Sequence, residues 1–60
     1  MRKITIIEKT TNKTILDVSC VVDYQITNYN DSTDVEVTTV DNVKYTVSLK
    51  DEFKYKIIID

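Results

Sequence analysis

The sequence predicts one all-β domain, residues 1–60, in which five antiparallel strands form a meander that curls into a small, partly open barrel. Thr, Val and Ile dominate the chain, and β-branched residues favour strands over helices. Apolar residues alternate with polar ones at a period of two, nearly from end to end. No stretch carries the i, i+3, i+4 apolar pattern of an amphipathic helix.

Five stretches of alternation define the expected strands. They cover residues 3–9, 14–28, 34–39, 43–49 and 53–59. The side chains expected to face inward are Ile4, Ile6, Leu16, Val18, Cys20, Val22, Tyr24, Ile26, Val35, Val37, Tyr45, Val47, Leu49, Phe53, Tyr55, Ile57 and Ile59. The second strand is too long to stay flat in so small a sheet, so we expect it to coil and to serve both halves of the barrel.

The turn between the third and fourth strands tests this register. A two-residue turn would put the two apolar faces out of phase. A three-residue loop, 40–42, pairs Val37 with Tyr45 and Val35 with Val47. This loop needs a left-handed residue at its third position, which Asn42 supplies, because asparagine tolerates that conformation best after glycine.

The other connections follow the same reasoning. A loop over 10–12, closed by a left-handed Asn12, pairs Ile6 with Leu16 and Ile4 with Val18. Residues 29–32 form a polar loop, and 50–52 suit a tight turn or one turn of 3₁₀ helix.

This order of parts resembles an SH3-like barrel over the whole chain. Five strands in sixty residues, a tight hairpin between the third and fourth, and a short turn before a brief last strand all match that layout. The chain lacks an ALYDY-like segment, tryptophan and proline, so the resemblance does not imply binding of proline-rich peptides. A plain curled sheet is the alternative architecture.

Residue types that most enzymes need are missing. There is no histidine and no glycine, and Cys20 is the only cysteine, which excludes an intrachain disulfide, a usual zinc site and a glycine-rich phosphate loop. We expect Cys20 to be a buried structural residue. We interpret carboxylates such as Asp17 and Asp23 as solvated surface charges. The sequence therefore predicts no enzyme, no metal and no cofactor.

Lysines gather on the last two expected strands: Lys44, Lys50, Lys54 and Lys56. They could form a basic strip for nucleic acid, with a tyrosine stacking on the bases. Strand parity places Tyr45 and Tyr55 on the opposite face, and lysines on edge strands also prevent aggregation. The sequence thus favours a protein partner over nucleic acid.

An acidic row is a candidate surface for that partner. Its members are Asp31, Asp34, Glu36 and Asp41, which follow one loop, strand and turn. Such a row can oppose a basic groove, as in inhibitors that imitate DNA phosphates. A solvated face is the competing interpretation.

Four apolar residues are expected on the outward face: Ile7, Ile15, Val21 and Ile58. The predicted pairing places Ile7 directly across from Ile15. A contiguous group of this kind marks an interface, which a homodimer or a host protein would cover with Tyr29 as a rim anchor. The alternative is a second small core, formed where the long strand curls over itself.

Compartment and origin complete the hypothesis. Ten acidic and eight basic residues leave the chain near neutral, and no apolar run is long enough for a signal peptide or a membrane span. The absence of Gly, Pro and Ala, with abundant Lys, Ile and Asn, indicates a low-GC bacterial genome or its phage. We therefore expect a cytoplasmic, phage- or mobile-element-encoded protein that occludes a host or defence protein stoichiometrically. The alternatives are a nucleic-acid-binding barrel and a structural component of a virion or larger assembly.

Overall fold

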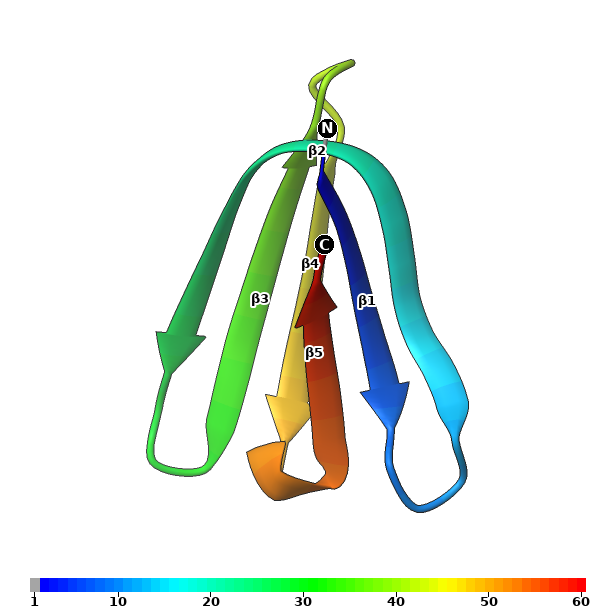
Figure 1. Cartoon of the computed structure of the whole chain (residues 1–60). Coiled ribbons are helices and arrows are strands. Elements are labelled where there is room, and N and C mark those ends of the chain that lie inside the picture. The colour runs from blue at the N-terminus through cyan, green and yellow to red at the C-terminus, as the bar shows by residue number, and fades with distance from the viewer. Residues whose placement is uncertain (1) are drawn as a thin grey trace.

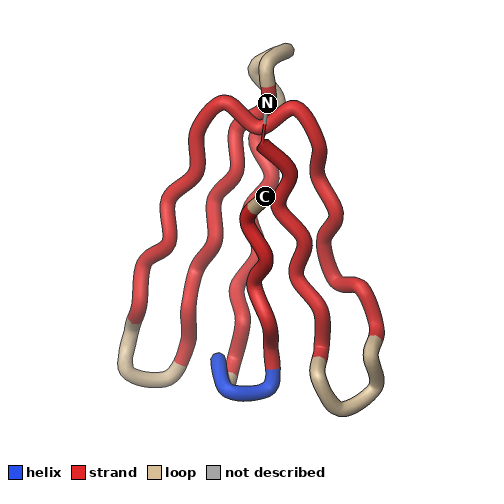
Figure 2. The backbone as a smooth tube through the Cα atoms, viewed as in Figure 1, coloured by secondary structure: helices blue, strands red, loops and turns tan. Residues whose placement is uncertain are grey.

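In the part of the chain that the structure describes, five antiparallel strands and one short 3₁₀ helix make up the fold. Figure 1 shows their arrangement. The computed structural model describes residues 2–60, apart from the side chain of Glu52. The elements are β1 (Arg2–Glu8), β2 (Lys13–Asn28), β3 (Ser32–Thr39), β4 (Lys44–Lys50), η1 (Glu52–Lys54) and β5 (Tyr55–Ile59). Figure 2 shows how little of the described backbone lies outside strands. The predicted all-β class is confirmed.

The strands form one sheet that is not closed, in the order β4-β3-β2-β1-β5. The first four strands follow one another as hairpins, as predicted. The last step of the predicted meander is wrong, because β5 pairs with β1 and not with β4. The turn between β4 and β5 is the expected 3₁₀ turn, but the chain uses it to cross over. As a result β4 and β5 are the two edges of the sheet.

The long strand β2 divides the sheet into two wings. Residues 13–20 pair with β1, which also carries β5, and we call these three strands the β1 wing. Residues 23–28 pair with β3, which also carries β4, and these form the β3 wing. Val21 lies at the junction, because it pairs with Arg2 on one side and Thr39 on the other. The prediction that the long strand serves both halves is confirmed.

Bulges produce the bend between the wings. The register of β2 shifts between Arg2 and Ile4 on the β1 side, and between Val21 and Asp23 on the β3 side. An extra residue on one strand bends it and increases its twist. Cys20 has a φ of 59°, in the left-handed region. In Figure 1, β2 accordingly arches over the molecule, with one arm in each wing.

This bend overturns the predicted parity in the middle of β2. Val21, predicted to face outward, is only 4% exposed, whereas Val22, predicted to face inward, is 57% exposed. Cys20, predicted to be buried, is exposed. The bulge at Cys20 shifts the alternation by one position, and the second bulge restores it for Tyr24.

The β3–β4 hairpin has the predicted loop and register. Val37 pairs with Tyr45, and Val35 with Val47. The Asn42 N–H donates to the Thr39 carbonyl at 2.9 Å, and the φ of Asn42 is 66°. The left-handed asparagine that the loop requires is therefore present.

The first hairpin has the predicted strand pairs but a longer loop. Ile6 pairs with Leu16, and the φ of Asn12 is 59°, as expected. Ile7, however, pairs with Thr14, so Ile15 is the extra residue of a bulge. The prediction that Ile7 lies directly across from Ile15 is therefore wrong.

A small core lies on the inner face of the sheet. Its buried apolar side chains are Ile4, Ile6, Val18, Val21, Val35, Val37 and Leu49, and Leu16, Tyr24, Val47, Tyr55 and Ile57 pack against them. Both wings contribute, so the core holds the two arms of β2 together. Among the described residues, no helix is long and apolar enough to cross a membrane.

Candidate functional site

Two of the four apolar residues predicted on the outer surface, Ile7 and Ile58, lie together there. Ile58 and Ile15 are each 38% exposed, and Ile7 is half-buried. Because Ile58 pairs with Thr5 and Lys56 with Ile7, Ile58 lies diagonally across from Ile7 on the outer face of the β1 wing. Val21 is not part of this surface, because the bulge at Cys20 turns it into the core.

The acidic row is shorter than its sequence spacing predicts. Asp34 and Glu36 share the outer face of β3, where they pair with Thr27 and Gln25 of β2. The Asp41 carboxylate lies in the β3–β4 turn and accepts a hydrogen bond from the Thr39 hydroxyl at 2.5 Å. The carboxylate of Glu36 lies 4.0 Å from the ammonium of Lys44. Two acids therefore remain as a row, while Asp41 stabilises a turn.

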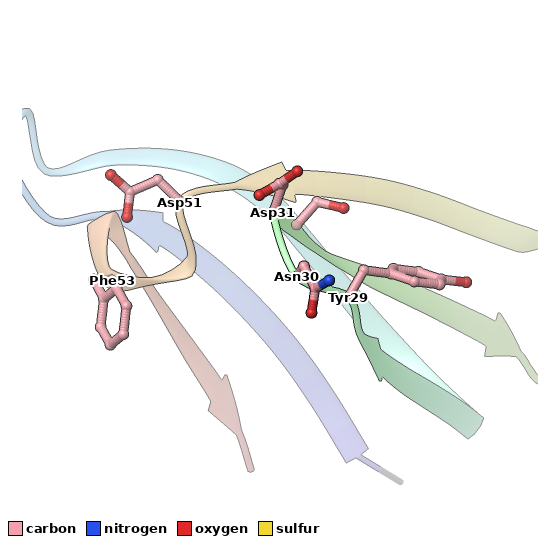
Figure 3. A pocket seen from close by; sticks show the side chains of 6 residues that line it. Tyr29, Asn30, Asp31, Asp51 and Phe53 are labelled. Atoms are coloured by element: carbon pink, nitrogen blue, oxygen red, sulfur yellow. The ribbon is translucent and has the colours of Figure 1, made fainter.

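Asp31 lies at the other end of the molecule, in the β2–β3 loop. There it lines a shallow pocket with Tyr29, Asp51 and Phe53. Figure 3 shows the two carboxylates on one side of this pocket, and the rings of Tyr29 and Phe53 directed away from each other. Tyr29 is 59% exposed and follows the β3-wing arm of β2, whereas Ile7 and Ile58 lie on the β1 wing.

The predicted lysine strip is divided between the two edges of the sheet. Lys44 and Lys50 belong to β4 and Lys56 to β5, and these strands have no ladder hydrogen bonds to each other. The ammonium of Lys54 lies 3.9 Å from the carboxylate of Asp51. Tyr55 packs against the core. Along the ladders, the lysines do not form one continuous row with an aromatic platform beside it.

The most exposed aromatic residue was predicted to face inward. Phe53 is 81% exposed, because it lies in η1, before β5 begins. It stands at the edge of an apolar opening between the wings, which we call the mouth. The residues lining the mouth are Lys9, Ile26, Asn28, Thr33, Leu49, Phe53, Tyr55 and Ile57.

The sequence contained one signal for this feature. Phe53 follows Asp51 and Glu52 directly, in the segment expected to form a tight turn or a 3₁₀ turn. A residue within such a turn does not obey the alternation of the strand that follows it. Extending the turn by two residues would have placed the ring outside the strand.

Cys20 is exposed, in a chain without histidine. Within residues 2–60, apart from the side chain of Glu52, no three Cys, Asp or Glu side chains are grouped so that they could hold a metal ion. What the described surface offers is apolar area, strand edges and scattered charge.

Comparisons of the chain with protein-family models, with curated proteins and with solved structures found no match.

Proposed function

We propose that this chain is a small protein-binding module that acts stoichiometrically by covering a surface of its partner. An SH3-like architecture that is not closed is supported by the two wings, by the β2 strand that they share and by the 3₁₀ turn before β5. In this proposal, the failure to close creates the binding site. The two wings leave an apolar mouth that a partner side chain or loop fills.

The exposed Phe53 ring at the mouth carries the proposal. The Phe53 ring is 81% exposed and does not stand alone, because it lines an apolar opening together with Ile26 and Leu49. Beside it, Ile26 is 37% exposed and Leu49 forms the floor at 2%. Buried aromatic anchors next to apolar pockets supply most of the binding energy in protein interfaces. Phe53 would be such an anchor once a partner covers it.

The partner we propose is a protein of a low-GC bacterial host, met inside the cell by a phage- or mobile-element-encoded inhibitor. This part of the proposal is supported by the composition, which lacks Gly, Pro and Ala. Asp34 and Glu36 add a small acidic surface on the β3 wing that suits a basic rim on the partner.

A matched pair of baits tests the proposal. The wild-type chain, Phe53→Asp and Val40→Asp are used to capture proteins from a low-GC host lysate. Val40 is 56% exposed but lies in the β3–β4 turn, outside the mouth, so it controls for the loss of any exposed apolar residue. A specific partner should be retained by Val40→Asp and lost with Phe53→Asp.

Calorimetry with the purified partner completes the test. We expect a one-to-one complex in which Phe53→Ala lowers the affinity at least about tenfold, as hot-spot truncations do. Equal capture by all three baits would contradict the proposal. A salt-sensitive shift of DNA or RNA by the wild-type chain, abolished by lysine substitutions, would instead support the nucleic-acid alternative.

A further inference from the structure

The free edge of β5 carries three residues whose backbone groups point away from the sheet. Lys3 and Asp60 exchange two hydrogen bonds, at 3.4 and 2.9 Å, and Lys9 donates to the Lys54 carbonyl at 2.7 Å. Antiparallel pairs alternate between hydrogen-bonded and non-bonded. Since Ile4 pairs with Ile59 in this ladder, the outward positions are Tyr55, Ile57 and Ile59. Their N–H and C=O groups face outward from an edge strand.

This edge lacks the protection that natural edge strands usually carry. Charged residues and prolines on an edge strand prevent pairing with another chain. The other edge, β4, is bracketed by Lys44 and Lys50. In contrast, β5 reads Tyr-Lys-Ile-Ile-Ile, with one lysine in five residues. Ile58 and Ile59 are 38% and 37% exposed, so both faces of β5 are partly apolar.

We propose that a second copy of this chain pairs with β5 through a two-fold axis at Ile57, so that the two sheets become continuous. In this register Ile57 faces Ile57 of the second copy, and Tyr55 faces Ile59. Each of these pairs exchanges two backbone hydrogen bonds. The Tyr55–Ile59 pairs are of the aromatic and β-branched kind that stabilises antiparallel strands. The proposal does not depend on the function proposed above.

Charge complementarity selects this register. The backbone ladder with β1 extends in the same register from Asp60 to Lys54. A two-fold axis at Ile57 therefore sets Lys54 opposite Asp60 of the second copy, twice in each dimer. The ammonium of Lys54 is also 3.9 Å from Asp51, but both side chains are more than half exposed, which makes that pair weak.

On the other edge, an axis at the centre of β4 gives repulsion. A two-fold axis at Val47 of β4 would set Lys44 opposite Lys50 of the second copy, again twice. Like charges directly opposite each other destabilise a strand pair. The register centred on Ile57 of β5 thus places unlike charges opposite each other, whereas the register centred on Val47 of β4 places like charges opposite each other.

Proline variants test the proposal. The outward N–H of Ile59 serves no bond to β1, so Ile59→Pro blocks pairing with a second copy while leaving the ladder to β1 intact. Thr46→Pro is the matched control, because Thr46 is exposed on the β4 edge and its N–H also points outward. Mass is measured by sedimentation equilibrium over about 1 µM to 1 mM, in reducing buffer to exclude a Cys20 disulfide.

We expect dimers for the wild-type chain and Thr46→Pro, and monomers for Ile59→Pro. Monomers of the wild-type chain at every concentration would overturn the proposal, and so would assemblies larger than a dimer, which indicate β4–β5 pairing. Amide exchange of the wild-type chain supplies a measurement that needs no variant. Protection at Tyr55, Ile57 and Ile59 should rise with protein concentration, and unchanged exchange there would also overturn the pairing.

A charge reversal tests the register. Asp60→Lys should weaken the dimer about fivefold to tenfold, because it places two lysine pairs opposite each other. Combining it with Lys54→Asp restores opposite charges and should recover most of the affinity. Equal dissociation constants for the wild-type chain, the single variant and the double variant would show that the axis does not lie at Ile57.

Discussion

The two wings share one strand but differ in regularity and in surface. In the β3 wing, β3 pairs with β4 over seven consecutive positions without a register shift. Its outer face is polar, with Gln25, Glu36 and Thr46 in one row across the strands. In the β1 wing, the β1–β2 ladder shifts register twice, the outer face carries Ile7 and Ile58, and the bulge residue Ile15 is 38% exposed. The outer face of the regular wing is therefore polar, and the outer face of the bulged wing is partly apolar.

The junction between the wings gives the largest expected effect. Val21→Asp should place a carboxylate in the core without a partner, at a cost of about 4 kcal/mol. A 60-residue domain has a total stability of roughly 3–9 kcal/mol, so the variant should be largely unfolded at room temperature. Circular dichroism and urea titration measure this loss.

Val22→Asp is the matched control, one residue along the same strand. Val22 is 57% exposed, so this substitution should change stability by less than about 0.5 kcal/mol. If Val22→Asp instead cost more stability than Val21→Asp, the alternation along β2 would be uninterrupted and there would be no bulge at Cys20.

The difference between the wings also explains what the sequence could predict. The β3–β4 hairpin was predictable because apolar residues on both strands must be in phase, which leaves one loop length and one place for a left-handed residue, Asn42. In the middle of β2, the residues Cys20, Val21 and Val22 are all apolar. Alternation cannot be assigned within such a run, so a bulge there leaves no local trace.

Long-range pairing was the other limit. A short turn between β4 and β5 is compatible with a hairpin, in which β5 pairs with β4, and with a crossover, in which β5 pairs with β1. Which of these two strands β5 joins depends on contacts between residues far apart in the sequence. The mouth depends on that decision, so it could not be predicted from the sequence, whereas the exposure of Phe53 had a local signal in the turn that precedes β5. The outer isoleucines of the β1 wing were found because ladder parity holds locally around Ile7 and Ile58.

The β3–β4 turn should give the second largest effect. Asn42 has a φ of 66°, a region that β-branched side chains avoid. Asn42→Val should therefore destabilise the fold by about 2 kcal/mol, whereas Asn42→Gly should be neutral or slightly stabilising. Thermal melts of both variants provide the measurement. A melting temperature of Asn42→Val above that of the wild-type chain would mean that the loop has another conformation.

A smaller effect is expected from the hydroxyl that joins this turn to the strand. Thr39 is 6% exposed, and its Oγ1 donates to Asp41 and accepts from the N–H of Val43 at 3.3 Å. Thr39→Val keeps the shape but removes both bonds, at a cost of about 1 kcal/mol in urea titration. Thr38→Val is its control on the outer face of β3 and should cost less than half as much. Equal costs would show that the hydroxyl of Thr39 adds nothing to the turn.

The smallest effect is expected at the bend of β2, and it should have the opposite sign. Cys20 holds a φ of 59° without the freedom of glycine, which costs about 1 kcal/mol or more. Cys20→Gly relieves this strain but gives the unfolded chain more freedom, so the net gain should be about 0.5 kcal/mol. Cys20→Val, which cannot adopt that φ cheaply, should lose stability. The Cys20 carbonyl accepts a hydrogen bond from the N–H of Val40 at 2.9 Å, which links the bend of β2 to the β3–β4 turn. We expect Cys20→Gly to keep this backbone bond. If Cys20→Gly instead melted below the wild-type chain by several degrees, the left-handed residue would not be what sets the angle between the wings.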